Sequence, residues 1–373
     1  MKLDEIEKMT NAKLIDTIKE KLNKGEEVPL KKLKKAIQEI YSEDSIEKAS
    51  LPLYESLIKD APKMYEYHRL EILGFESRLQ QRWLDALYTL QSIITIAEEV
   101  SMSILDEYIE DFKHEDGKIV VPIELDILAK LHARAIVIGK EVFTLLKSGF
   151  ADAAISRWRG LHEINVIFTI LTDTLKENES LGKELAYRFL DSATIEQFKI
   201  IHRENIISKE FGKDYKEIKS EKEDIERKYG KSFSKPYEWA RPLFENKRMD
   251  QSIYFSDLEQ TAEITNLTSY YKQANSQIHS TAFGLYRSLG SIYNEKIDTI
   301  GAVFGPSNYG LSIPGQLTVG SVAGSTISFL LVNPTLDKLI ISNILQLMVK
   351  DAQENFDRIQ NEILNEELSQ LDE

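Results

Sequence analysis

Residues 157–168, RWRGLHEINVIF, combine two arginines, a histidine and a glutamate with otherwise apolar neighbours. Histidine can exchange a proton near neutral pH, and arginine can stabilise the negative charge of a reacting phosphate. On a helix, Arg159 and Glu163 are spaced to form an ion pair, and His162 lies in the same sector. We therefore predict four candidate catalytic residues: Arg157, Arg159, His162 and Glu163. An Arg–Glu pair that only ties a core helix to its neighbours explains the same residues without any reaction.

A second polar group lies in QANSQIHSTAF, residues 273–283. On a helix, His279 follows Asn275 by one turn and stands close to Ser276, so the three side chains lie on neighbouring faces. His279 is a second candidate acid or base. Asn275 and Ser276 are candidate ligand-binding residues, because their side chains both donate and accept hydrogen bonds. A core histidine that is satisfied by polar neighbours is the alternative.

Three further side chains can complete a site. Tyr187 and Asp191 share one face of the helix predicted for AYRFLDSATIEQF, since they are four residues apart. Tyr271 belongs to YYKQ and lies two helical turns before His279. We predict Tyr187, Asp191 and Tyr271 as ligand-binding residues.

The sequence lacks the motifs that hold metals, cofactors or phosphate groups. Cysteine is absent, which removes disulfides, thiolate zinc sites, iron–sulfur clusters and cysteine nucleophiles. HExxH, GxSxG, the Walker loop and GxGxxG are also missing, and a di-iron bundle would need paired Glu-x-x-His motifs. We therefore expect no cofactor and no metal. Ordinary hydrolase, kinase and dehydrogenase chemistry lacks support.

The elements that must position these residues are helices, because apolar residues recur at helical spacing along almost the whole chain. Gly149 is a good helix terminator just before the helix that carries Arg157. Residues 301–324 differ, since glycines, prolines and β-forming residues are mixed there. We predict a mostly α multi-helix bundle, with a short β-hairpin or ordered loop near residues 301–324.

The helical pattern and the charge distribution indicate four parts along the chain. Two short amphipathic helices begin it, a longer helical region follows, and the acidic segment NEELSQLDE ends it. The predicted parts are a small N-terminal helical hairpin at residues 1–45, a helical extension at 46–120, a helical core domain at 121–345, and the end of the last helix with an acidic tail at 346–373.

Length and charge bound the class of protein. The chain has 373 residues, a formal net charge of −14 and a pI near 5.1. This balance disfavours a broad basic surface for nucleic acid, although a local basic pocket is compatible with it. The start, MKLDEIEKMT, lacks the apolar core of an export signal, and the chain has no apolar run of about 18 residues. We expect a cytoplasmic protein without a membrane span.

Three short segments in a fixed order carry a family resemblance. They are RGLHE at residues 159–163, KPYEWA at 235–240 and YYKQANSQIHS at 270–280. Their succession resembles a family of bacterial proteins known only as a domain of unknown function. The resemblance covers residues 125–345 and leaves the first 120 residues outside. It implies a helical fold and no established reaction.

A more distant similarity is to HEPN domains, which are helical and include many metal-independent ribonucleases of toxin and phage-defence systems. Arg157 and His162 match the Arg-x4–6-His spacing of that motif. The similarity implies RNA cleavage without a metal, with His162 or His279 as acid or base. Arg157 or Arg159 would stabilise the phosphate. It also implies a site built at a dimer interface.

Two hypotheses for function follow. The first is an intracellular bacterial effector or sensor, of phage-defence or toxin type, that acts as a metal-independent endoribonuclease. The second is a non-catalytic helical binding or scaffold module whose Arg/Glu/His cluster is structural or lines a ligand pocket. The expected partners are RNA or a nucleotide as ligand, a protein bound through the N-terminal helices, and further copies of the chain in a homo-oligomer.

Overall fold

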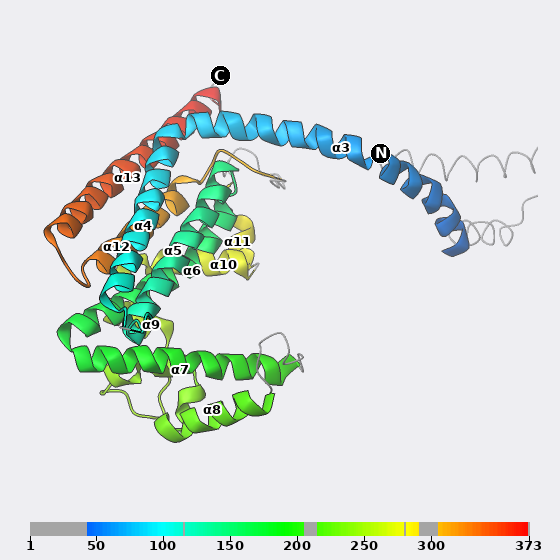
Figure 1. The fold of residues 1–373 in the computed structure, drawn as a ribbon. Coiled ribbons are helices and arrows are strands. Elements are labelled where there is room, and N and C mark those ends of the chain that lie inside the picture. The colour runs from blue at the N-terminus through cyan, green and yellow to red at the C-terminus, as the bar shows by residue number, and fades with distance from the viewer. Residues whose placement is uncertain (1–42, 115, 205–214, 280, 291–304, 372–373) are drawn as a thin grey trace, which may run out of the picture. The chain divides into compact units, whose positions relative to one another are not determined.

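A computed structural model of the chain describes residues 43–114, 116–204, 215–279, 281–290 and 305–371, most of which are helical (Figure 1). The chain divides into two compact units, residues 1–75 and residues 76–373. The described part of the first unit is residues 43–75 of helix α3 (Glu43–Arg82). Its apolar side chains are largely exposed, as at Tyr54 and Tyr65. The hairpin predicted for residues 1–45 lies almost wholly outside the described residues.

The core of the second unit is a bundle of long helices around α12. Helix α12 packs against four others, and its buried side chains include Val319, Val322 and Phe329. This central position explains why α12 is apolar on most sides, since a helix surrounded by others buries most of its surface. The helices of this bundle are α4 (Leu84–Asp111), α5 (Ile123–Lys147), α6 (Ala151–Glu177), α12 (Ser312–Leu330) and α13 (Leu336–Leu371).

Further elements surround one end and one side of the bundle. Helix α7 packs against α5 and α6 and carries α8 alongside it (Figure 1). Helices α9 and α10 both contact α6, and therefore face the motif that begins at Arg157. These elements are α7 (Glu179–Glu204), α8 (Tyr215–Tyr229), η2 (Lys231–Ser234), η3 (Glu238–Leu243), α9 (Phe255–Thr261), η4 (Thr265–Leu267), α10 (Thr268–Ile278) and α11 (Ala282–Tyr286).

A glycine makes the reversal between α5 and α6. Gly149 has a φ of +82°, which L side chains rarely adopt, and its N–H donates to the carbonyl of Leu146 at 3.0 Å. The N–H of Phe150 donates to the carbonyl of Leu145 at 2.9 Å. These bonds satisfy the last carbonyls of α5 and start α6 two residues later. The terminator predicted at Gly149 is confirmed.

The prediction of a mostly α bundle is confirmed, but most of the segment predicted to be a short β-hairpin or ordered loop is helix. Residues 312–324 belong to α12, while residues 305–311 are not helical and residues 301–304 lie outside the described ones. Small residues allow α12 to approach its neighbours closely. At Gly315, an added Cβ would collide with the ring of Phe356. Close packing of α12 thus outweighs the turn and strand propensities of its glycines and β-branched residues.

The second compact unit also differs from the predicted division of the chain. It begins at residue 76, and α4 packs against α5, α12 and α13 within it. The sequence places α4 in an extension at residues 46–120, because periodicity shows that a face is apolar but not which helix covers it. Helix α13 continues past residue 345, in keeping with the prediction that residues 346–373 begin as the C-terminal part of the last helix.

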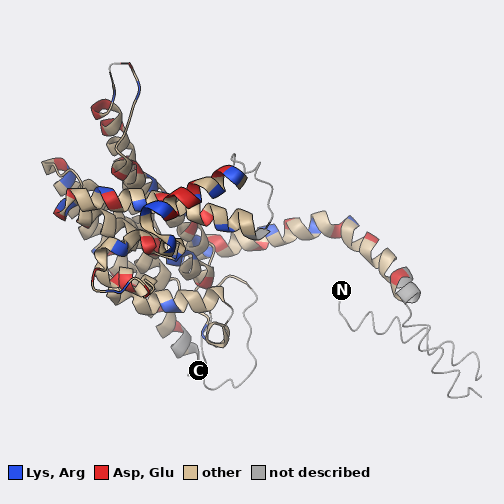
Figure 2. Ribbon diagram, turned by 90° about the horizontal axis from the view of Figure 1, so that it is seen from below, with Lys and Arg blue, Asp and Glu red and all other residues tan. Residues whose placement is uncertain are grey.

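Charged residues of both signs are interspersed along the described helices (Figure 2). Many of them pair, as Lys140 does with Glu98 and Lys338 with Glu107, each at 2.7 Å. Within the described residues, no helix has both the length and the apolar content that a membrane crossing requires.

Candidate functional site

Two candidate catalytic residues of α6, Arg159 and Glu163, meet Tyr271 of α10. Arg159 Nη2 lies 2.7 Å from Glu163 Oε1. The hydroxyl of Tyr271, on α10, donates to the same carboxylate oxygen at 2.7 Å and accepts from Arg159 Nη2 at 3.0 Å. The Arg159 guanidinium also lies 5.1 Å from the centre of the Tyr271 ring. The three side chains form a closed, half-buried triangle that joins α6 to α10.

Burial changes the chemistry of Tyr271 within this triangle. Burial raises the pKa of Tyr271, and its hydrogen bond to the Glu163 carboxylate raises it further. The hydroxyl therefore keeps its proton at neutral pH and remains a hydrogen-bond donor. Burial also raises the pKa of Tyr237, and the negative charge of Glu163 acts in the same direction.

His162 lies beneath this triangle and is sealed. Its Nε2 is 2.8 Å from Glu259 Oε1 of α9, and the two side chains are 0% and 3% exposed. Its ring stacks on Trp158 at 5.2 Å and meets the rings of Phe255 at 5.8 Å and Tyr271 at 5.5 Å. The His162–Glu259 pair is thus enclosed by aromatic side chains. We call Arg159, His162, Glu163, Glu259 and Tyr271 the sealed cluster.

Two opposing effects act on the His162 imidazole. Burial lowers the pKa of His162, while the Glu259 carboxylate favours the protonated ring and raises it. Burial is the larger effect, so the neutral ring is favoured more than in solution. Nδ1 of the ring is buried without a hydrogen-bond partner among the described residues. A general acid or base must reach the proton that it transfers, and no substrate can approach this ring without displacing its neighbours.

The other two candidate catalytic residues lie apart from the sealed cluster. Arg157 pairs with Glu141 on α5. His279 is the exposed residue that caps the C-terminus of α10. It follows Tyr271 by eight residues, about 12 Å along a helix axis. The structure therefore brings together Arg159, His162 and Glu163, but places Arg157 and His279 elsewhere.

The predicted ligand-binding residues also separate. Tyr187 is 51% exposed. Asp191 accepts hydrogen bonds from the hydroxyl of Tyr229 at 2.9 Å and from Lys228 Nζ at 3.2 Å, both on α8. Their helix α7 is anchored instead by Arg188, which is buried and donates to the carbonyl of Trp239 at 3.0 Å. This neighbourhood holds α7, α8 and η3 together.

Tyr271 joins the sealed cluster, whereas Asn275 and Ser276 do not. Ser276 Oγ donates to the carbonyl of Gln273 at 2.7 Å, which is a local helical bond. Asn275 Oδ1 is buried without a hydrogen-bond partner among the described residues. Sequence analysis missed Glu259, the partner of His162. Its own segment, FSDLEQT, offers no signal that this glutamate is buried, because the pairing spans 97 residues of sequence.

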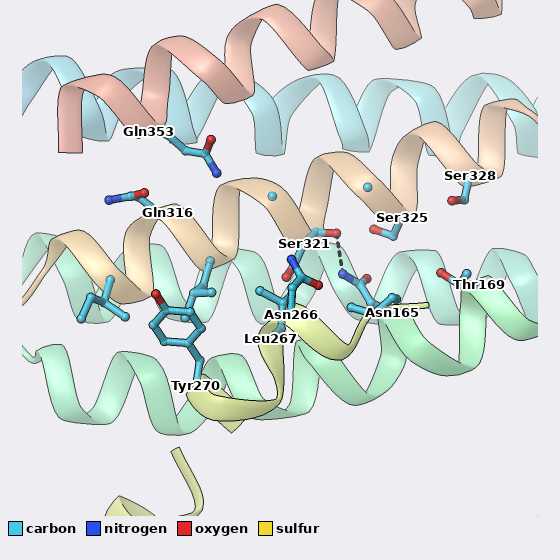
Figure 3. A pocket seen from close by; sticks show the side chains of 15 residues that line it. Asn165, Thr169, Asn266, Leu267, Tyr270, Gln316, Ser321, Ser325, Ser328 and Gln353 are labelled. Carbon is cyan, nitrogen blue, oxygen red and sulfur yellow. Dashed lines mark hydrogen bonds between the residues drawn. The ribbon is translucent and has the colours of Figure 1, made fainter. Parts of the chain in front are cut away.

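An open cavity of about 450 Å³ lies on another side of α6 (Figure 3). It is bounded by α6, the segment around η4, the start of α10, one face along most of α12, and α13, and we call it the α12 cavity. Among the described residues that line it, none is charged. Its polar groups include Asn165, Asn266, Gln316, Ser321, Ser325 and Gln353.

None of the residues predicted as catalytic or ligand-binding is among those that line the α12 cavity. The sequence does carry one signal of it, the run of serine, threonine and glycine in GQLTVGSVAGSTIS. The prediction of a short β-hairpin or ordered loop at residues 301–324 covers most of this run, and neither conformation would place its small residues on one helix face.

A second hollow of about 550 Å³ lies between α5, α7 and the segment that contains η2 and η3. Its lining is mainly apolar and includes Phe189, Phe233 and Trp239. Two lysines are among the lining residues, and both already have a partner. Lys130 donates to Asp126, and Lys199 donates to the carbonyl of Ser234. Across the described part of the chain, no group of three or more His, Asp or Glu side chains is arranged to hold a metal ion.

Residues 125–296 match a family described as a family of unknown function (DUF5677). The prediction of a domain of unknown function is confirmed for these residues. The match includes α6, α9 and α10 and thus the whole sealed cluster, but it ends before α12. No curated protein and no solved structure matches the chain.

Proposed function

We propose that this chain is a non-catalytic helical binding module, in which the sealed cluster is structural and a small molecule is bound in the α12 cavity. Such a module can act as the sensing part of an effector. The burial of His162 carries the proposal. An imidazole that is 0% exposed and bonded to a buried carboxylate holds α6 to α9, and it offers no proton to a substrate.

The geometry of the α12 cavity supports the second half of the proposal. Ligand sites are usually concave, measure about 300–1,000 Å³, and combine apolar walls with a few polar groups. The α12 cavity has about 450 Å³ and both kinds of lining. Elements far apart in sequence meet there, since Asn165 of α6 donates to the carbonyl of Ser321 on α12 at 3.0 Å.

The ribonuclease hypothesis would need a histidine and an arginine around one accessible point. Of the two candidate histidines, His162 is sealed and His279 lies on the surface away from the Arg159–Glu163 pair. Arg157, the arginine of the HEPN-like spacing, is paired with Glu141. We therefore favour binding over cleavage.

An RNA-cleavage assay tests this choice. Purified chain is incubated with total RNA in the presence of a chelator, beside the variants His162→Gln and His279→Ala. Each variant is checked for its fold by circular dichroism. We expect no cleavage by any of the three proteins. Cleavage by the wild type that is lost in either folded variant would contradict a non-catalytic role.

A further inference from the structure

Two glycines in the middle of α12 have no packing reason within the described chain. A glycine inside a helix costs about 1 kcal/mol relative to alanine. At Gly139 of α5 a close contact explains that cost, because an added Cβ would come within 2.9 Å of Val322 Cγ2. At Gly320 and Gly324, an added Cβ would meet no atom of the described residues within 4 Å. The space above these two glycines is the α12 cavity itself.

The bare backbone at Gly320 and Gly324 lets a flat molecule approach α12 closely. The two glycines are four residues apart, so they lie on one face, one turn above the other. Ser328 continues the same face by another turn and also lines the cavity. A ring placed on this face would contact the helix backbone, which a side chain at either glycine would prevent.

The polar groups around the helix face of Gly320 and Gly324 are uncharged, and they can form hydrogen bonds with the edge of such a ring. Four carboxamides line the cavity: Asn165, Asn266, Gln316 and Gln353 (Figure 3). A carboxamide can donate and accept hydrogen bonds, but Gln316 Nε2 already donates to Ser312 Oγ and Asp357 Oδ1, so Gln316 offers a ligand its oxygen as an acceptor. Asn165 is fixed, because its Nδ2 donates to the Ser321 carbonyl at 3.0 Å. Its Oδ1 is buried and has no hydrogen-bond partner among the described residues. A buried acceptor without a partner costs about 1–3 kcal/mol, which an N–H or O–H that reached this oxygen would offset.

An aromatic ring completes the lining. Tyr270 precedes Tyr271 of the sealed cluster, and its ring points into the cavity (Figure 3). It can stack on a planar ligand, as aromatic side chains do on unpaired bases. The anchoring of Tyr271 by Arg159 and Glu163 fixes the helix that presents Tyr270.

We infer that the α12 cavity binds an uncharged planar heteroaromatic molecule, specifically a nucleobase or a nucleoside without phosphate. This inference rests on the proposed function. Carboxamides pair with the donor and acceptor edges of bases, most directly with adenine. A phosphate in this cavity would lose water without meeting a cation, since no lysine or arginine is among the described residues that line it. A ligand whose phosphate must enter the cavity is therefore disfavoured relative to the same ligand without phosphate.

Calorimetric titration of the full chain tests the inference. The probes are adenosine, guanosine, cytidine and uridine, each compared with its 5′-monophosphate. We expect one nucleoside to bind with one site per chain and to bind more tightly than its monophosphate. The variant Gly324→Leu places a side chain in the space above Gly320 and Gly324 and should weaken binding by about tenfold or more, equivalent to about 1.4 kcal/mol. Gln91→Leu adds the same side chain on the exposed face of α4 and should bind as the wild type does.

Asn165→Ala supplies a second variant that decides the result even where Gly324→Leu fails to fold. It removes the acceptor oxygen and should also weaken nucleoside binding by about tenfold. Equal binding to the wild type and to both folded variants would overturn the site. Tighter binding of a monophosphate, or no binding of any nucleoside, would overturn the ligand class.

Three readouts separate this inference from the proposed function. Binding of an uncharged sugar such as trehalose that Gly324→Leu abolishes would overturn the nucleoside assignment and leave a binding module. A dimer that dissociates on Gly324→Leu, measured by analytical ultracentrifugation, would overturn the inference by showing that a second helix occupies the cavity. RNA cleavage that depends on His162 would instead overturn the proposed function.

Discussion

Two regions beside α6 differ in a way that the residue types alone do not suggest. The sealed cluster holds ionisable groups that are usual in active sites, yet His162 and Glu259 are 0% and 3% exposed. The α12 cavity holds only uncharged groups among its described lining residues, yet it is open and measures about 450 Å³. Access, rather than the reactivity of the side chains, separates a structural polar cluster from a candidate binding site.

The two regions are also stabilised differently. In the sealed cluster the carboxylates of Glu163 and Glu259 pair with Arg159 and His162, which offsets the cost of removing these groups from water, although Arg159 Nε and His162 Nδ1 have no partner among the described residues. In the α12 cavity the Cα of Gly320 borders open space, and Asn165 Oδ1 has no hydrogen-bond partner among the described residues. Both regions therefore keep polar atoms without partners in the described chain, but the α12 cavity also leaves space beside a helix backbone that a larger side chain could fill.

The largest expected effect is on the sealed cluster. Glu259→Leu leaves His162 without its partner, and breaking a buried pair in this way costs about 3–5 kcal/mol of unfolding free energy. Urea denaturation followed by circular dichroism measures the loss. Glu259→Gln keeps a hydrogen-bonding group beside the His162 ring and is the matched control, with a smaller loss expected. A change below about 1 kcal/mol in Glu259→Leu would show that the cluster is not structural.

A second buried histidine predicts how stability depends on pH. Burial lowers the pKa of His132 to about 4, from 6.5 for the free group. The unfolded chain therefore takes up the proton first as the pH falls, so stability is full above pH 6.5 and is lost down to about pH 4. The loss amounts to about 3 kcal/mol.

The comparison that isolates this histidine uses two variants. His132→Gln should flatten the dependence of unfolding free energy on pH between 6.5 and 4. His202→Gln, at an exposed ring, should leave it unchanged. If both variants keep the slope of the wild type, then the acid sensitivity comes from other groups. Since burial also lowers the pKa of His162, a residual slope of the same sign is expected in His132→Gln.

A substitution on α12 tests whether close packing explains its first glycine. Gly315→Ala places a Cβ against the ring of Phe356, which is fully buried. Overpacking of this kind costs about 1–3 kcal/mol, and the melting temperature should fall. An unchanged or raised melting temperature would show that Phe356 can move aside, and that the glycine is not required by this contact.

The smallest expected effect has the opposite sign. Gly320→Ala adds a Cβ where no described atom lies within 4 Å, and it should raise the unfolding free energy by about 0.5–1 kcal/mol. The same melting experiment measures it beside Gly315→Ala. A gain in stability accompanied by weaker nucleoside binding would sharpen the contrast between the two regions. A loss of stability would mean that the backbone at Gly320 already has an unseen neighbour.

Much of the fold follows from the sequence, because helical periodicity and the break at Gly149 are local signals. The spacing of Arg159 and Glu163 likewise predicts their ion pair, which the structure contains at 2.7 Å. The sequence does not show which helix packs against each helix face. The bond from His162 to Glu259 joins residues 97 positions apart, and nothing in either segment specifies it.

The α12 cavity was beyond prediction for a related reason. Local propensity favours a turn or strand at GQLTVGSVAG, whereas contacts with α4, α5, α6 and α13 make it a helix. Only with that helix in place do Gly320 and Gly324 align on one face beside Asn165. Tertiary packing thus decides the secondary structure here, and the secondary structure decides the site.

Chemical modification of histidine measures access to the sealed cluster directly. The native chain is treated with diethyl pyrocarbonate, and the label at each histidine is quantified by mass spectrometry. Two histidines are buried, His132 and His162, and four are exposed: His68, His114, His202 and His279. We predict that the four exposed rings are labelled rapidly while His132 and His162 are protected until the protein is unfolded. Labelling of His162 in the native protein at a rate similar to that of His279 would contradict the account, since a reagent that reaches His162 shows that a substrate can reach it too.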